Sequence, residues 1–140
     1  MDTIDLLTRL GVATACGLLV GLQREHSGHR SAGLRTFGLI GALGALCGLL
    51  AASFGPWLPA AGLLAVAAYF VGAHVANRAD EAPGMTTEIA ALAVYALGLL
   101  ISQGQLAAGV VATGAVMLLL QYKQAGRALV ERIEIGRAHV

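Results

Sequence analysis

The chain has 140 residues, of which 57% are hydrophobic and 12% charged, and its mean hydropathy is +0.75. A domain of this size does not bury so much apolar surface by folding alone, so the composition excludes an ordinary soluble domain and predicts a membrane protein. The net charge is only +1, and the sequence has no phosphate loop, metal-type cysteine spacing or nucleophile motif. We therefore expect neither a nucleic-acid partner nor an enzyme.

Five apolar runs follow one another along the chain, at residues 4–22, 36–53, 57–76, 86–101 and 106–122. Most approach the roughly 20 residues that a helix needs to cross the hydrocarbon core of a bilayer. The runs are continuous and rich in Ala, Leu and Gly, which favours helices over the alternating strands of a barrel. We predict an all-α, polytopic membrane helix bundle with about five transmembrane helices. The fourth run is the shortest, and a re-entrant helix is the alternative there.

Basic residues divide unevenly between the two sides that five spans create. One side receives Arg24, Arg30, Arg35, Arg78, Lys123, Arg127 and Arg132. The other side receives Arg9 alone. Because short cytoplasmic segments collect positive charge, this asymmetry predicts an N-terminus outside the membrane and a C-terminus inside.

Glycines recur at helical spacing in the first two runs. Gly17 and Gly21 are four residues apart, as are Gly44 and Gly48, and Gly41 precedes the second pair. Small residues on one face let helix backbones approach closely in lipid, so we expect these glycines to be helix-packing residues and the first two spans to pack tightly. The pattern leaves open whether such faces meet within one chain, in a homo-oligomer, or against another membrane protein.

Polar residues gather at the boundaries of the first and third loops, which share one side of the predicted membrane. We expect a cytoplasmic-side polar patch made of Arg24, Glu25, Arg35, Thr36, Thr86, Thr87 and Glu88. Thr86 or Thr87 is expected to cap the fourth helix, and Glu88 suits its first turn because the helix dipole favours an acidic group there. Pairing of Glu25 or Glu88 with Arg24 or Arg35 would compensate part of the free-energy cost of burying these charges.

Two interpretations of this patch remain open. In the first, the patch fixes the topology and holds the loops at lipid phosphates. In the second, its carboxylates bind a cation. Candidate oxygen ligands for a hydrated Mg²⁺ are Glu25, Asp80, Glu81 and Glu88, and no other cofactor is expected.

These residues also carry a family resemblance. The sequence resembles the membrane domain of the MgtC/SapB family in three ordered motifs, formed by Gly17, Gly21, Arg24 and Glu25, by residues 32–36 (AGLRT), and by residues 84–87 (GMTT). Gln23 and Phe37 depart from the family pattern, where many members have glutamate and histidine, so ligand proposals that rest on those two groups do not apply.

The resemblance implies a multi-pass, N-out protein of the bacterial inner (plasma) membrane, in contact with the lipid bilayer. It implies a role in Mg²⁺ transport or Mg²⁺ homeostasis. The alternative that it implies is a non-transporting regulator that binds another membrane complex, such as ATP synthase.

Three segments are predicted along the chain. Residues 1–124 form the transmembrane domain, and residues 125–134 form a polar, amphipathic segment at the cytoplasmic interface, which is expected to lead to a further C-terminal region. Residues 135–140 (IGRAHV) match the translation of a common sequencing adapter, and we exclude them from the fold prediction.

Overall fold

The structure is a computed structural model and describes residues 2–26, 33–76 and 85–138. These residues form five helices: α1 (Thr3–His26), α2 (Leu34–Phe54), α3 (Trp57–Ala76), α4 (Met85–Ser102) and α5 (Leu106–Ala138). No strand occurs among the residues so described. The all-α prediction is therefore confirmed.

Three of the helices are long and apolar enough to cross a membrane, over Thr3–Glu25, Leu34–Phe54 and Trp57–Ala76. The remaining apolar helical segments, Thr87–Ser102 and Leu106–Tyr122, are shorter. Large apolar side chains such as those of Leu64, Val111 and Leu119 lie exposed on the outer surface. Exposed apolar surface of this extent suits contact with lipid, and the composition of the helices is that of a multi-pass membrane protein.

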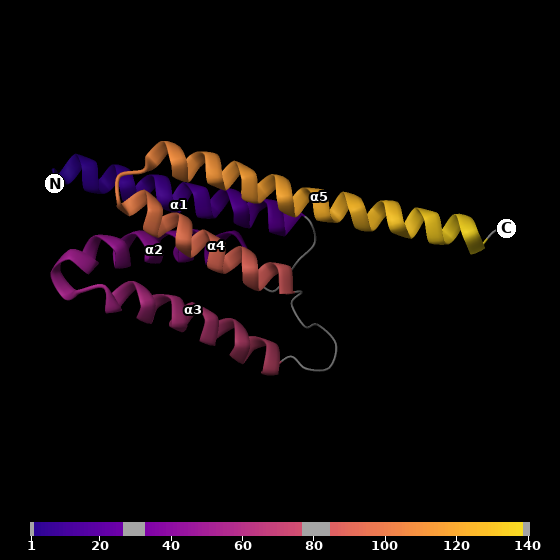
Figure 1. The fold of residues 1–140 in the computed structure, drawn as a ribbon, viewed down its shortest axis with the longest axis horizontal. Helices are drawn as coiled ribbons and strands as arrows, with labels where there is room; N and C mark the ends of the chain where they lie inside the picture. The colour runs from indigo at the N-terminus through magenta and orange to yellow at the C-terminus, as the bar shows by residue number, and fades with distance from the viewer. Residues whose placement is uncertain (1, 27–32, 77–84, 139–140) are drawn as a thin grey trace.

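The helices form a bundle with an inner and an outer set (Figure 1). Helices α1, α2 and α4 pack against one another, whereas α3 contacts α2 and α4, and α5 contacts α1 and α4. Helix α3 buries only Val66 and Phe70, so most of its surface faces outward. The core is built mainly between the inner three helices, where Val20, Phe37 and Tyr95 are almost fully buried.

Glycines permit the close approach of the inner helices. A Cβ at Gly17 would overlap the carbonyl oxygen of Phe37 in α2, and one at Gly21 would stand 2.9 Å from the Cα of Leu34. These contacts place the glycines of α1 against α2, at a spacing that larger residues do not allow.

The glycines of α2 face two different neighbours. A Cβ at Gly41 would stand 2.5 Å from the carbonyl oxygen of Ala13 in α1. A Cβ at Gly44 would instead overlap the carbonyl oxygen of Tyr95 in α4. Gly48 likewise lies against α4, at Ser102. The second half of this glycine series thus packs on α4, a neighbour that the spacing alone does not identify.

Two short turns close the bundle at the end where α2 and α4 finish. Gly55 and Gly104 have φ angles of 103° and 90°, in the left-handed region that residues with a Cβ rarely adopt. The Gly55 N–H donates to the Ala51 carbonyl at 2.8 Å and ends α2. Pro56 follows Gly55, and α3 starts at the next residue.

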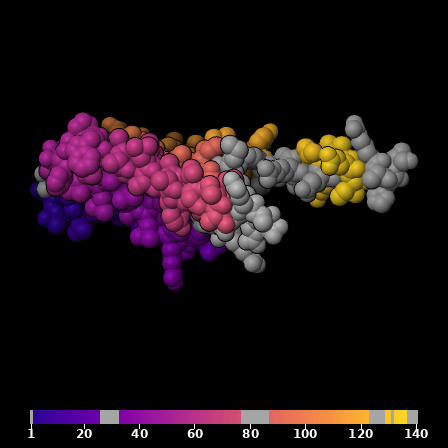
Figure 2. All heavy atoms as spheres, turned by 90° about the horizontal axis from the view of Figure 1, so that it is seen from below, coloured from indigo at the N-terminus to yellow at the C-terminus, as the bar shows by residue number. Residues whose placement is uncertain are grey.

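Helix α5 is longer than the membrane run predicted from the sequence. It continues without a break from Leu106 to Ala138, so residues 125–134 form part of this helix. Its last part extends beyond the body of the bundle (Figures 1 and 2). Apolar side chains there, including Leu129, Val130 and Ile133, are exposed. The assignment of residues 125–134 to a membrane interface stays a prediction.

Candidate functional site

Four helix termini meet at one end of the bundle, which we call the Arg24 end. Helices α1 and α3 finish there, and α2 and α4 begin there (Figure 1). The antiparallel order of the helices therefore brings the polar residues of the first and third loop boundaries to the same end. Asp80 and Glu81 lie outside the described residues, and so does the side chain of Thr86.

The centre of this end is a contact between Arg24 and Thr87. Arg24 lies in the last turn of α1, with 2% of its surface exposed, and Thr87 lies in the first turn of α4, with 0% exposed. The Arg24 Nη2 donates a hydrogen bond to the Thr87 Oγ1 at 2.5 Å. Because α4 begins at Met85, Thr86 and Thr87 lie inside the helix and the predicted capping role is wrong. The Thr87 hydroxyl instead joins two inner helices.

Two helix ends act on Arg24 in opposite directions. The last turn of α1 carries the negative end of its helix dipole and favours a cation there. The start of α4 carries the positive end of its helix dipole, which favours anions over a guanidinium. A cation taken out of water costs several kcal/mol before hydrogen bonds and charges compensate it. An ionisable residue buried within a membrane helix is, by default, the first hypothesis for a functional site.

Glu25 and Arg35 lie at the same end but on the surface. The Glu25 side chain is exposed, and its Oε1 lies 3.4 Å from the position of a Cβ on Gly33, the residue that precedes α2. An acidic group suits this location because Gly33 gives the helix no side-chain cap and the start of α2 attracts negative charge. Arg35 is exposed in the first turn of α2, and Thr36 lines a groove between α2 and α3.

Glu88 is joined to α3. Its Oε1 lies 3.7 Å from the Nδ1 of His74, whose side chain is half exposed, and this contact becomes an ion pair when the histidine is protonated. Glu88 itself is partly buried in the first turn of α4. The sequence analysis did not predict this histidine contact, and the pairing of Glu25 or Glu88 with an arginine stays a prediction.

Gln23 contributes a link that the sequence analysis treated only as a departure from a motif. Its Nε2 donates to the Met117 carbonyl in α5 at 2.8 Å. The signal in the sequence is a polar side chain next to Arg24, one residue beyond an apolar run. With Arg24 and Thr87, it connects α1 to both α4 and α5 at this end.

The carboxylates do not gather into one cluster in the described part of the chain. No group of three or more His, Cys, Asp or Glu side chains within residues 2–26, 33–76 and 85–138 is placed to hold a metal ion. Glu25 lies beside the start of α2, and Glu88 lies beside the end of α3. These two groups offer separate, partly exposed oxygens at the Arg24 end, suited to contact with a hydrated cation.

The opposite end of the bundle has its own arginine contact, and we call it the Arg9 end. The Arg9 Nη1 donates to the Ser102 carbonyl at the end of α4, at 2.7 Å. Its Nη2 pairs with the Asp5 carboxylate one turn earlier in α1, at 2.9 Å. Arg9 was considered in the sequence only as the lone basic residue of its side.

Comparisons with known proteins complete the description of the site. Neither the curated proteins nor the solved structures gave a significant match. The sequence profile of the MgtC family matches residues 10–128, a stretch that includes Arg24, Thr87 and all five of the packing glycines discussed above. Because the match covers most of the chain, the protein belongs to the MgtC family.

Proposed function

We propose that the chain is a magnesium-homeostasis protein of the bacterial inner membrane that acts as a regulator of another membrane protein. In this proposal it crosses the membrane five times, with its N-terminus outside and the Arg24 end at the cytoplasmic side. Family membership supports the link to magnesium, and the excess of Lys and Arg in the sequence segments that flank the spans on one side supports the orientation.

The observation that carries the regulatory role is the buried Arg24. Its guanidinium lies between α1 and α4 and is bound by Thr87, at the place where α1 ends and α4 begins. A buried positive charge repels cations, so the interface of α1 and α4 is an unfavourable route for Mg²⁺. The same contact joins the end of α1 to the start of α4, and in this proposal the surface around it is what a partner protein recognises.

The second candidate function is Mg²⁺ transport. Glu25 and Glu88 favour it, because both carboxylates lie at the Arg24 end and outside the closely packed interior. In this alternative Mg²⁺ is the substrate, and the carboxylates attract the hydrated ion to the cytoplasmic side.

Growth in low magnesium tests whether the Arg24 end is functional. In a bacterial strain whose growth at low magnesium depends on this protein, we expect Arg24→Met to abolish growth while the protein still inserts. Arg9→Met is the matched control, because it removes a guanidinium that joins the same two helices at the other end. Membrane levels of each variant are measured by immunoblot, and Arg24→Lys tests whether the charge alone suffices. Equal growth of both methionine variants at equal membrane levels would remove the basis of the proposal.

Flux measurements separate the two candidate functions. Purified protein in liposomes that contain a Mg²⁺-sensitive dye is compared with empty liposomes and with a Glu25→Gln, Glu88→Gln double variant. The regulatory proposal expects no flux above that of empty liposomes, together with loss of low-magnesium growth for Arg24→Met. Flux that the double variant lacks would favour transport instead.

A further inference from the structure

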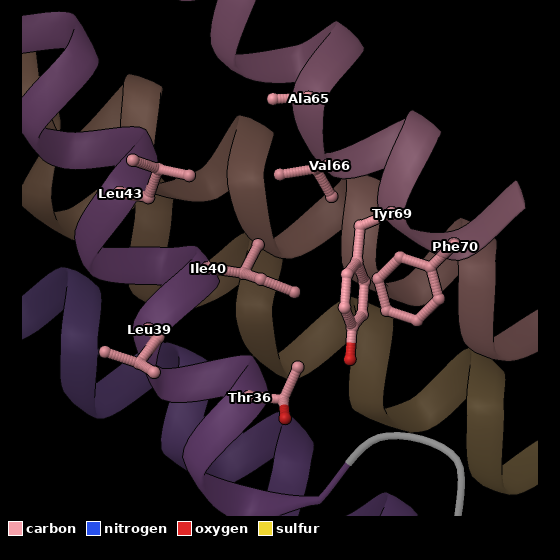
Figure 3. Close-up of a pocket in the computed structure, with 8 residues that line it drawn as sticks. All are labelled: Thr36, Leu39, Ile40, Leu43, Ala65, Val66, Tyr69 and Phe70. Carbon is pink, nitrogen blue, oxygen red and sulfur yellow. The ribbon is translucent and has the colours of Figure 1, made fainter. Parts of the chain in front are cut away.

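An open apolar groove runs between α2 and α3 on the outer surface of the bundle (Figure 3). Its volume is about 380 Å³. The floor is formed by three buried side chains, those of Ile40, Val66 and Phe70. A hollow of this kind in a lipid-facing surface must be filled, because an unfilled apolar surface forfeits dispersion contacts.

The walls of the groove are exposed side chains. Leu39 and Leu43 form the α2 wall, and Ala65 and Tyr69 form the α3 wall. From Thr36 to Leu43 the groove follows about 10 Å of α2, at 1.5 Å per residue. This is about one third of the hydrocarbon thickness of a bilayer, so the groove accepts part of an acyl chain lying along the helices.

Polar groups are confined to one end of the groove. Only Thr36 and Tyr69 bring side-chain oxygens to the lining, and Figure 3 shows the Tyr69 hydroxyl directed toward the end where Thr36 lies. Thr36 lies in the first turn of α2, so this is the Arg24 end. An aromatic ring along the groove with its hydroxyl toward the helix terminus is the arrangement of an amphipathic side chain at a membrane boundary.

A basic side chain, that of Arg35, lies at the same end. Arg35 precedes Thr36, and it shares a helix face with Leu39, four residues further along α2. Arg35 is exposed, and the two ion pairs found within the described residues, Arg9 with Asp5 and His74 with Glu88, do not involve it. The groove therefore combines an apolar channel with a cation and two hydroxyls at its mouth.

We propose that this groove binds one anionic phospholipid, with an acyl chain between α2 and α3 and the phosphate at Arg35, Thr36 and the Tyr69 hydroxyl. Basic side chains at the cytoplasmic ends of membrane helices recognise anionic headgroups, and hydroxyls donate hydrogen bonds to phosphate oxygens. The site is separate from the Arg24–Thr87 contact and does not depend on the role in magnesium homeostasis.

Native mass spectrometry of the detergent-purified full chain tests the proposal. The probes are phosphatidylglycerol and phosphatidylcholine with identical acyl chains, added in matched titrations. One basic residue near an anionic headgroup corresponds to about a fivefold preference, so we expect the first lipid to bind about fivefold more tightly as phosphatidylglycerol than as phosphatidylcholine. Arg35→Gln should remove this preference. Arg132→Gln, which changes an exposed arginine of α5, should leave it intact.

A second pair of variants tests the acyl-chain channel. Ala65→Phe fills the groove and should weaken binding of both lipids severalfold, whereas Ala68→Phe changes an exposed alanine of α3 outside the groove and should leave binding intact. Leu43→Trp fills the groove from the opposite wall, so the test does not depend on one variant folding; circular dichroism checks the helical content of each.

Three results would overturn the proposal. The first is equal affinity of the unmodified protein for the two lipids. The second is unchanged lipid binding in both filled variants. The third is a dimer in the mass spectrum of the unmodified protein that the filled variants lose, while their lipid binding stays unchanged. That result would make a second copy of the chain the occupant of the groove.

Discussion

Each end of the bundle has an arginine that joins α1 to α4, but the two arginines meet opposite ends of the α4 dipole and differ in burial. Arg9 donates to a carbonyl at the end of α4, where the helix dipole is negative and a cation is favoured. Arg24 donates to a hydroxyl at the start of α4, where the dipole is positive. Arg9 also has a carboxylate partner, Asp5, and its side chain keeps 18% of its surface exposed, whereas Arg24 is 2% exposed.

The difference separates a partly solvated arginine from one that is shielded from water. The Arg9 end needs no explanation beyond helix-end electrostatics and an ion pair one turn away. At the Arg24 end the α1 and α4 dipoles oppose each other, so the feature that sets this end apart is the almost complete burial of a guanidinium, which costs free energy. The proposed function therefore lies at the Arg24 end, and the two ends should respond differently to substitution.

The largest effect should come from the contact on which both ends depend. Gly44 lies in the middle of α2 against the Tyr95 carbonyl of α4, so Gly44→Leu must force these backbones apart. We expect a loss of about 3 kcal/mol or more in the free energy of unfolding, at the upper end of what overpacking costs. Denaturation in detergent micelles, followed by circular dichroism, measures it.

Gly114→Leu is the matched control for this substitution, because a Cβ at Gly114 meets nothing within 4 Å. The control variant should retain the stability of the unmodified protein or gain slightly from the better helix propensity of leucine. Similar losses in the two variants would show that the close contact between α2 and α4 is not what holds the ends in place.

The second effect concerns the Arg24 end alone. Thr87→Val keeps the shape of the buried side chain but removes the oxygen that accepts from Arg24. Hydrogen bonds to charged groups contribute about 1.5–3 kcal/mol, and we expect a loss of that size in the same denaturation experiment. Low-magnesium growth should fall with it.

Thr113→Val serves as the comparison, since Thr113 is also buried but its hydroxyl donates within its own helix, to the Gly109 carbonyl at 2.8 Å. That bond joins no other helix and no charge, so its loss should cost about 1 kcal/mol or less. If Thr113→Val were the more damaging change, the contact between α1 and α4 would not be the stronger one.

The sequence was sufficient to predict the helices, because apolar runs near membrane length have few alternatives. It also placed Arg24, Glu25, Thr87 and Glu88 at one end, since the order of the spans determines which loops share a side. It was not sufficient to predict which helix faces pack against one another. Residue spacing shows that Gly44 and Gly48 share a face but does not show that this face packs on α4.

The charged contacts were harder to predict for a related reason. Sequence analysis expected carboxylates to pair with arginines because opposite charges attract, and it did not predict the contact of Glu88 with a histidine or that of Arg24 with a hydroxyl. Which groups meet depends on the rotation of each helix about its axis, and packing of the whole core sets that rotation. The first residue of α4 was also hard to predict from the sequence. The threonines expected to cap the helix lie within it.

The smallest effect should come from Arg9→Met, and its response to salt distinguishes the two ends. The substitution removes the bond to the Ser102 carbonyl and the pair with Asp5, whose side chain is 43% exposed. Arg9 is partly exposed, so water replaces much of what both contacts provide, and the loss should be smaller than for Thr87→Val. Raising the salt concentration from 0.1 to about 1 M shortens the screening length from roughly 10 Å to 3 Å and should shrink the Arg9 effect. The Thr87→Val effect should stay nearly constant because the Arg24 guanidinium is shielded from ions. A salt response of equal size at both ends would mean that solvent reaches Arg24, and the electrostatic argument for a functional site there would fail.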